Sequence, residues 1–503
     1  MARHSGPALR AVAWLTLSLA GLGLTLVATV RAIDRTTAAS GPSVRQLVQG
    51  TREPPVHGTG AGSGRIFPRE NTENSGRTKH GRLGPGDLLL VVSEDFAGGD
   101  HRFSVRARLS GVADTGAVAG GGSSGAAGRA VLSGRAVLSG RGFGAVCAAG
   151  ETAESGVGSV CSGGECVSGV ELPARRLFQL PRLSLERPVA VLSECELAGE
   201  AFGVGIYSEV AAVESAAAVQ ARLADFLSGG WLAAVEAVLG PILDVDSSGG
   251  LTVVVGHLDP AGESGEYPLW GCVRESDFGV SEAGPAGDIL YLDVGVAEIS
   301  ESDFRSLLVH ELSHAACFSR LLERRLAGLG DLLLPRWFHE SLAHLVECAL
   351  AGERGLLQRR REACWRDPGS APVVVNLQQM TWSASRRGPR AAGYRFLLSG
   401  GGVERMSGGE LVSLLREAGD FDDLLGQFLG GDREGALRDW ASGEAVAMAA
   451  AGQQWIPELS VSGVTERRVL GTAFMVWRAG SEGLDVSVES SDDSDWTLTV
   501  IRR

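Results

Sequence analysis

The segment His310-Glu311-Leu312-Ser313-His314 decides how this chain of 503 residues is interpreted. On an α-helix, two histidines at positions i and i+4 lie on one face, where their imidazoles can bind one metal ion. The glutamate between them is placed to act as general base toward a metal-activated water. Histidine is scarce, and four of the nine histidines fall between residues 310 and 344. The alternative is a solvated helix face that carries two histidines without a metal.

The residues around this segment predict an amphipathic helix that follows a short strand. Apolar side chains recur with helical spacing at Phe304, Leu308, Leu312 and Ala315. Ser300, with Asp303 three residues later, is a variant of the capping box and predicts that the helix begins near residue 301. Upstream, residues 288–293 predict a strand whose edge could hydrogen-bond an extended peptide.

A zinc ion that activates water needs three protein ligands and one open position, so a third ligand must come from elsewhere. The extended motif H-E-x-x-H-x-x-G-x-x-H is absent, because position 317 is Cys and position 320 is Arg. A second helix is predicted from Pro335 onward, after a turn near residues 328–330. We expect its Glu340 to be the third ligand, and an ordinary exposed helical glutamate is the alternative.

Three more side chains of the second helix bear on the site. His344 follows Glu340 by four residues on the same face, so it is an alternative ligand, a supporting residue, or a helix histidine without a metal role. His339 points about 100° away from Glu340 and is expected to pack or to lie at the rim. Glu347, about one turn beyond His344, is expected to be solvated or to form a salt bridge.

The segment HELSH followed by PRWFHESLAHLVE (residues 335–347) resembles the gluzincin pattern H-E-x-x-H then W-x-x-E-G-x-A, and in particular the hyicolysin-like metallopeptidases. Residues 244–255, 267–272, 288–293, 393–398 and 421–440 resemble further segments of that family. The resemblance covers roughly residues 170–445 and is specific only at the metal motif. His339 and Ser341 depart from the family's Asn and Gly, which leaves the ligand positions intact.

The resemblance implies a thermolysin-like α+β fold that holds Zn²⁺ through His310, His314 and Glu340. Glu311 would be the general base. It also implies that Tyr394 stabilises the oxyanion, since gluzincins often use a tyrosine hydroxyl for that purpose. A half-buried core tyrosine in a helix is the alternative for Tyr394.

Composition and pattern divide the chain into five expected parts. A basic tip followed by an apolar run over residues 11–30 predicts a signal peptide or a membrane anchor. Short apolar runs between Gly and Ser predict a β-sandwich-like module. The expected parts are 1–32, a signal peptide or anchor; 33–85, a disordered linker; 86–213, a β-rich module with a low-complexity insert at 116–144; 214–455, the zinc peptidase domain; and 456–503, a β appendage.

The net charge and the cysteine content limit which binding partners and which cellular compartment are expected. A net charge of −14 argues against nucleic-acid binding, which needs a basic face. Eight cysteines fit an exported protein with some disulfides, and a bridge between Cys317 and Cys348 would stiffen the site. We therefore expect an extracytoplasmic protein, secreted or tethered through residues 11–30, and the sequence leaves its oligomeric state open.

These observations predict an exported zinc-dependent endopeptidase that acts on a protein or peptide substrate. An envelope adhesion or scaffold protein that retains a zinc peptidase fold without proteolysis is the main alternative. A zinc hydrolase with a non-peptide substrate is a third possibility.

Overall fold

The computed structural model describes residues 78–96, 99–110, 172–184, 187–258, 269–279, 287–375, 387–401, 409–461, 464–491 and 495–502. In these residues the protein combines three sheets with a set of helices, which confirms the α+β class. The predicted signal or anchor at 1–32 and the insert at 116–144 lie outside the described residues. Among the described helices, none has the length and apolar character needed to span a membrane.

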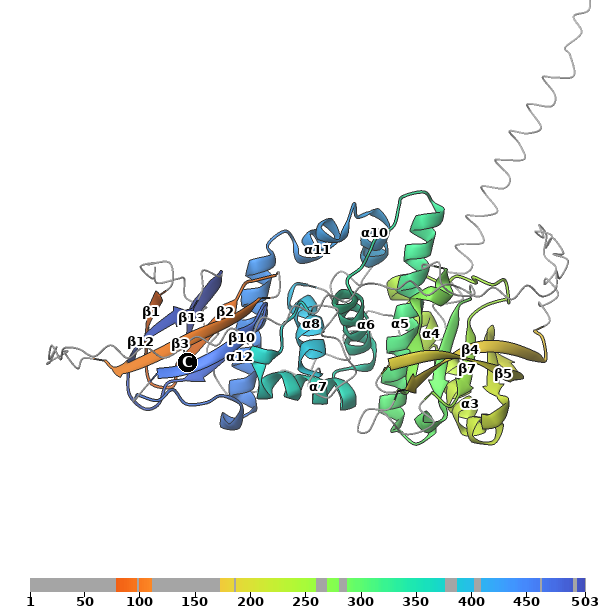
Figure 1. Cartoon of the computed structure of the whole chain (residues 1–503), viewed down its shortest axis with the longest axis horizontal. Coiled ribbons are helices and arrows are strands. Elements are labelled where there is room, and N and C mark those ends of the chain that lie inside the picture. The colour runs from red at the N-terminus through yellow and green to blue at the C-terminus, as the bar shows by residue number, and fades with distance from the viewer. Residues whose placement is uncertain are drawn as a thin grey trace, which may run out of the picture. The chain divides into compact units, whose positions relative to one another are not determined.

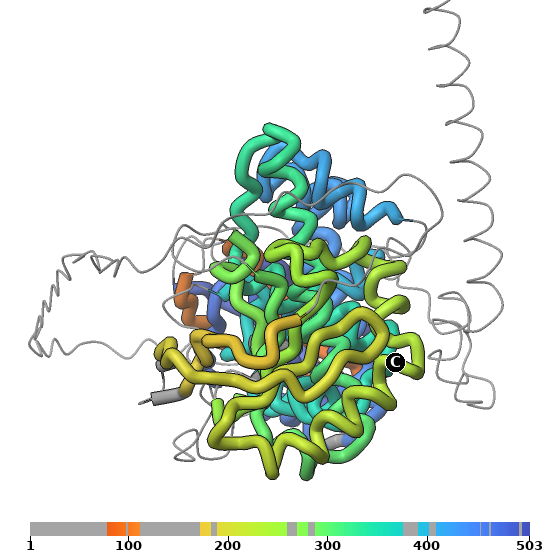
Figure 2. The backbone as a smooth tube through the Cα atoms, turned by 90° about the vertical axis from the view of Figure 1, so that its right-hand side faces the viewer, coloured from red at the N-terminus to blue at the C-terminus, as the bar shows by residue number. Residues whose placement is uncertain are grey.

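A six-stranded sheet supports the metal motif. Its order is β4-β5-β6-β7-β9-β8, where β6, β7 and β9 run parallel and the remaining pairs are antiparallel. The strands are β4 (Arg175–Ser184), β5 (Arg187–Ala201), β6 (Val204–Glu209), β7 (Thr252–Gly256), β8 (Gly271–Val273) and β9 (Ile289–Asp293). β7 is buried along its whole length, as its run of valines suggests for a central strand. The β4–β5 hairpin, in yellow, faces the viewer in Figure 2.

Helices pack against this sheet, and the chain then continues through further helices that lie away from it. Two of them, α3 (Val213–Ser228) and α4 (Trp231–Leu239), lie between β6 and β7 in the sequence. The others are α5 (Glu301–Leu326), α6 (Arg336–Ala351), α7 (Gly355–Arg366), α8 (Arg387–Ser399), α10 (Glu410–Glu417), α11 (Phe421–Leu429) and α12 (Arg433–Ala451). Short 3₁₀ turns occur at Val210–Ala212, Glu275–Phe278, Val294–Ala297, Pro368–Ser370 and Gln453–Trp455.

Local sequence explains where α5 begins and ends. The Ser300 hydroxyl accepts a hydrogen bond of 3.1 Å from the Asp303 backbone N–H, which caps the helix as predicted. After Leu326 the chain turns at Gly328 and Gly330, whose φ angles of 72° and 79° favour glycine. α6 then packs against α5, so the two halves of the metal motif face each other.

The first and last described strands form one β-sandwich. One sheet has the order β1-β12-β3-β10 and the other β11-β2-β13. Orange N-terminal strands alternate with blue C-terminal ones in Figure 1. The strands are β1 (Thr78–Leu83), β2 (Leu88–Ser93), β3 (Asp100–Leu109), β10 (Val464–Leu470), β11 (Phe474–Arg478), β12 (Leu484–Ser490) and β13 (Trp496–Ile501).

These strand pairings differ from the division expected from the sequence. Residues 86–213 do not form a separate module, because the strands between 175 and 209 belong to the six-stranded sheet. Residues 456–503 are not a separate appendage, because they complete the sandwich begun by β1–β3. The expected linker at 33–85 also extends too far, since β1 begins at Thr78.

β2 is buried on both faces and contributes to two cores. Leu89 and Val91 pack inside the sandwich, whereas Leu88, Leu90 and Val92 join the large core that includes the helices. Successive side chains of a strand point to opposite faces, so one apolar run serves both cores. The sequence LLLVVS therefore fits a strand between two layers.

The five described cysteines, Cys195, Cys272, Cys317, Cys348 and Cys364, are free thiols. The bridge considered between Cys317 and Cys348 is therefore absent. Burial raises the pKa of both thiols to about 12, which keeps them protonated and unreactive. The remaining cysteines lie outside the described residues.

Candidate metal centre

Helices α5 and α6 bring the three predicted ligands together. His310 and His314 lie one turn apart on α5, and Glu340 lies on α6. One possible ligand atom from each lies within 4.8 Å of the others. All three residues are at least 91% buried, so the helix pair, rather than the solvent, defines their arrangement.

The spacing of these atoms fits a tetrahedral zinc ion. The Nε2 atoms of His310 and His314 are 3.2 Å apart. Two nitrogens at typical Zn–N distances around a tetrahedral centre are separated by about 3.3 Å. The Glu340 Oε2 atom lies 3.9 Å from His310 Nε2. Two imidazoles and one carboxylate are a donor set that suits zinc and leaves a fourth position open.

A second cluster shares His310 and competes with the first. His310, His344 and Glu347 also have possible ligand atoms within 4.8 Å of one another. However, an Arg360 guanidinium nitrogen lies 2.6 Å from His344 Nε2, and a fixed positive charge there disfavours a metal cation. Burial of His344 and, to a smaller extent, the positive charge of Arg360 lower the pKa of this histidine to about 3. The cluster with Glu340 is therefore the better metal site.

Glu347 is a buried partner of the site, not the solvated residue expected from the sequence. It is 2% exposed, and its Oε2 atom lies 3.4 Å from His310 Nδ1 and 2.7 Å from His344 Nδ1. The Ser306 hydroxyl donates to its other oxygen. Burial alone would raise the pKa of Glu347, but the two histidines hold it below its usual range. A carboxylate behind a ligand histidine fixes the ring and its tautomer.

His339 contacts the other ligand histidine. Its Nδ1 atom lies 3.4 Å from His314 Nδ1, and the two rings meet edge to face. Burial, followed by His310, lowers the pKa of His314 well below its usual value, so its Nε2 lone pair is available. From the sequence, His339 was expected to pack or to lie at the rim. Its contact with His314 was not expected, because the spacing within one helix does not show which residues lie on the facing helix.

The predicted base, Glu311, lies between α5 and the sheet. The backbone N–H of Val273 donates a hydrogen bond to its carboxylate, and a Cβ on Gly271 would come within 3.5 Å of its Cγ. Burial, only partly offset by His310, raises the pKa of Glu311 to about 7. A carboxylate with that pKa can accept and return a proton near neutral pH.

The strand beside Glu311 is β8, which corrects one expectation. We expected residues 288–293 to offer a free edge to a peptide. That segment is β9, and it is paired on one side with β7 and on the other with β8. In the described part of the sheet, β8 is the terminal strand next to α5.

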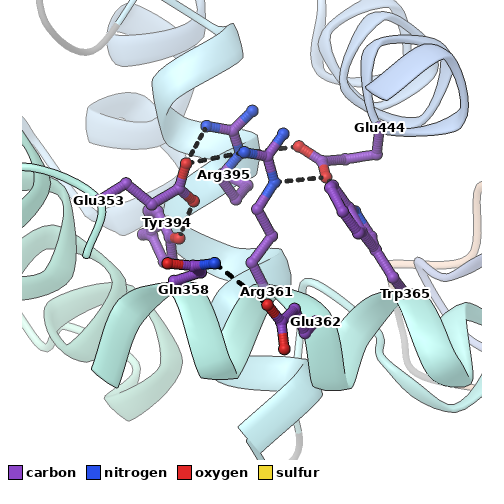
Figure 3. A network of polar contacts seen from close by, with 8 residues as sticks. All are labelled: Glu353, Gln358, Arg361, Glu362, Trp365, Tyr394, Arg395 and Glu444. Atoms are coloured by element: carbon purple, nitrogen blue, oxygen red, sulfur yellow. Dashed lines mark hydrogen bonds and ion pairs between the residues drawn. The ribbon is translucent and has the colours of Figure 1, made fainter. Parts of the chain in front are cut away.

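Tyr394 lies in a buried ionic network and not beside the metal ligands with its hydroxyl free. The side chain is fully buried, and its hydroxyl donates to Glu353 Oε1 over 2.5 Å (Figure 3). The centre of its ring lies 6.0 Å from the centre of the His344 ring. This placement does not support the expected oxyanion role, because the one donor proton is already used.

The network around Tyr394 joins α7, α8 and α12 to the segment between α6 and α7 (Figure 3). Glu444 of α12 accepts hydrogen bonds from Arg361 Nε at 3.2 Å, Arg395 Nε at 2.7 Å and Trp365 Nε1 at 2.7 Å. Glu353, just after α6, pairs with the same two arginines at 2.8 and 3.5 Å. Two carboxylates and two guanidiniums balance, so the network can remain buried.

Comparisons with known proteins add little to this geometry. No family model matches the chain and no curated protein matches it, so the resemblance to hyicolysin-like peptidases receives no support. Among solved structures, yeast LTA4 hydrolase in complex with bestatin is 16% identical at a TM-score of 0.30, over 48% of this chain and 37% of that one. Native yeast LTA4 hydrolase is 14% identical at a TM-score of 0.30, over 52% and 43%. The chain thus spans less than half of these proteins, and scores this low carry no argument, so the interpretation of the site rests on its own residues.

Proposed function

We propose that the protein is a zinc-dependent peptidase that hydrolyses peptide bonds with Glu311 as general base. The observation that carries this proposal is the convergence of His310, His314 and Glu340 with a buried, high-pKa Glu311 beside them. A site that only held a structural metal would need no such carboxylate next to its ligands. A thermolysin-like arrangement of the domain belongs to the same proposal.

The residues of this chain divide the chemistry among them. Zinc, when bound by His310, His314 and Glu340, supplies a Lewis acid that polarises the carbonyl and acidifies water. Glu311 accepts a proton from the attacking water as the new C–O bond forms. The same carboxyl then gives that proton to the amine as the C–N bond breaks. The Val273 N–H holds Glu311 toward the reaction, and Glu347 and His339 hold the two imidazoles.

A peptide substrate is supported by the strand next to Glu311. β8 pairs with β9 on one side only, among the strands that the structure describes. A terminal strand can add an extended peptide through main-chain hydrogen bonds, which aligns a scissile bond without demanding a particular side chain. Since Val273 of β8 also holds Glu311, a peptide added there would lie close to the base.

The decisive test is Glu311→Gln, assayed with a peptide library and by metal analysis. The amide keeps the shape of the side chain but cannot accept the proton, so kcat/KM should fall by about 10²-fold or more. Bound zinc should stay at one ion per chain. In the wild type, kcat/KM should fall as the pH is lowered through the pKa of Glu311, because Glu311 must be ionised to accept the proton, and bound zinc would place that pKa below the value of about 7 that burial gives.

Glu458→Gln is the matched control, since this glutamate is 60% exposed and lies outside the site. Near-wild-type hydrolysis by Glu311→Gln would refute the assignment of the base. Zinc binding without hydrolysis of any peptide would favour the scaffold alternative, and hydrolysis of esters or other small substrates alone would favour a non-peptide hydrolase.

A further inference from the structure

Three aspartates meet at the opposite end of β9 from the zinc helix. Asp244 and Asp246 lie in the segment between α4 and β7, and Asp288 immediately precedes β9. One carboxylate oxygen from each lies within 4.8 Å of the others. Their exposure differs, since Asp244 is exposed, Asp246 is partly buried and Asp288 is 1% exposed.

Asp288 has an unused acceptor in the interior. Its Oδ1 atom accepts a hydrogen bond of 3.0 Å from the Val245 backbone N–H, whereas its Oδ2 atom has no hydrogen-bond partner. A buried carboxylate oxygen without a donor or a cation is costly and rare in native proteins. Burial, together with Asp246 and Asp244, raises the pKa of Asp288 to about 7 despite backbone hydrogen bonds. The cluster thus lacks positive charge at its most buried member.

The remaining contacts hold the loop but do not neutralise it. Ser248 N–H donates to Asp244 Oδ1 at 2.9 Å and to Asp246 Oδ1 at 3.1 Å, and Gly249 N–H donates to Asp244 Oδ2 at 3.0 Å. The Arg176 guanidinium lies 2.6 Å from Asp246 Oδ2. When all three carboxylates are ionised, as a bound cation would favour, they and the one guanidinium carry a charge of −2, which one divalent cation balances.

We propose that Asp244, Asp246 and Asp288 bind a calcium ion, separate from the zinc site. The donors are carboxylate oxygens without histidine or thiolate, and Ca²⁺ prefers oxygen ligands and tolerates irregular geometry. Waters and nearby carbonyl oxygens would complete a shell of about six to eight. Because Asp244 is exposed, the affinity should be that of extracellular modules, with a Kd of about 10⁻⁴ to 10⁻³ M.

Such an ion would link two parallel strands at the centre of the sheet. The Asp288 carbonyl already accepts a hydrogen bond of 3.0 Å from Thr252 N–H at the start of β7. The ion would add a second link between the loop before β7 and the start of β9. β9 leads through a 3₁₀ turn into α5, so the platform of the zinc helix should gain stability.

Calcium titration of the zinc-loaded full chain, by calorimetry and thermal unfolding, tests this proposal. One Ca²⁺ per chain should bind, and Tm should rise by about 5 °C when calcium exceeds the Kd by roughly 100-fold. Asp288→Asn and Asp244→Asn should each weaken calcium binding by about tenfold or more. Bound zinc should not change in either variant. Asp422→Asn, at an exposed aspartate far from the cluster in sequence, should bind calcium as the wild type does.

The outcomes separate a real site from a structural acidic cluster. No binding heat, and no rise in Tm at a calcium concentration roughly 100-fold above the expected Kd, would overturn the proposal. An unchanged calcium response in Asp244→Asn, which removes an exposed carboxylate without disturbing the core, would overturn it equally. If calcium instead displaced zinc from its ligands, bound zinc would be lost on addition of calcium. The calcium response would then arise at the zinc site, and the proposal would be overturned.

Discussion

Replacing Glu347 by glutamine distinguishes the two clusters that share His310. If zinc is held by His310, His314 and Glu340, Glu347 only supports the His310 ring from behind, where its Oε2 lies 3.4 Å from Nδ1. If zinc is held by His310, His344 and Glu347 instead, the same substitution removes a ligand. The two arrangements therefore predict different losses of zinc affinity for one variant.

The expected size of the loss follows from the contact. The 3.4 Å approach of Glu347 to His310 Nδ1 would become a hydrogen bond to a charged acceptor once zinc holds the ring, and such a bond contributes about 1.5–3 kcal/mol. At 1.4 kcal/mol per tenfold change, this corresponds to a loss of about 10- to 100-fold in zinc affinity, the range found for residues that support metal ligands. Glutamine keeps one acceptor oxygen, so we expect the lower end, about tenfold. Glu340→Gln should cost more than Glu347→Gln, because it alters a ligand itself.

Zinc affinity would be measured by competition with a fluorescent chelator at fixed pH. Circular dichroism of each variant would check the fold, since Glu347 also accepts a hydrogen bond from Ser306. Glu458→Gln serves again as the exposed control. If Glu347→Gln abolishes zinc binding while Glu340→Gln leaves it unchanged, the ligand set proposed above is wrong and the second cluster holds the metal.

Two further predictions concern stability and thiols. Glu444→Ala leaves Arg361 and Arg395 buried against one carboxylate, so the free energy of unfolding should fall by about 3–5 kcal/mol, with a loss of roughly 10 °C in Tm by calorimetry. Glu458→Ala should change it by less than about 0.5 kcal/mol, and an equally small effect of Glu444→Ala would contradict the role of the network. The five described thiols are buried or partly buried and should react slowly with an alkylating reagent in the native protein, yet all should react after denaturation without reductant. Fewer than five modified cysteines by mass spectrometry would show disulfides that the structure lacks.

The alkylation experiment does not decide the cellular location of the protein. Protection of native cysteines would not show that they are oxidised, because burial alone protects them. Export from the cytoplasm therefore stays a prediction from the apolar run at residues 11–30, and cell fractionation is its direct test.

Local signals in the sequence predicted the parts of the site that depend on one helix or one turn. The cap at Ser300 and the glycines at 328 and 330 correctly set the length of α5 and the return of the chain. The spacing within α6 also carries a signal for Glu347, which was expected to be solvated or to form a salt bridge. Glu340, His344 and Glu347 follow at i, i+4 and i+7, which places all three on one face.

Other features have no local signal. Short strands of alternating pattern look alike, so the sequence did not show that 175–209 joins β7 and β9 while 78–109 joins strands near the C-terminus. Tyr394 matched a family expectation by residue type, but its hydroxyl is committed to Glu353 by a contact between α8 and the end of α6. Pairings of this kind depend on the packing of distant segments.

The strand β2, which packs in two cores, is synthesised long before its partner strands in the sandwich. β3 ends at Leu109 and the first of its late partners, β10, begins at Val464, so about 350 residues are made between them. At about 5–20 residues per second, the nascent Leu88–Val92 segment waits roughly 20–70 s for its neighbours. During that time the sandwich face of this apolar strand, which carries Leu89 and Val91, has no core to pack in, so the strand is a natural binding segment for a chaperone. A ribosome-bound chain that stops before residue 464 should therefore be the species most prone to aggregate.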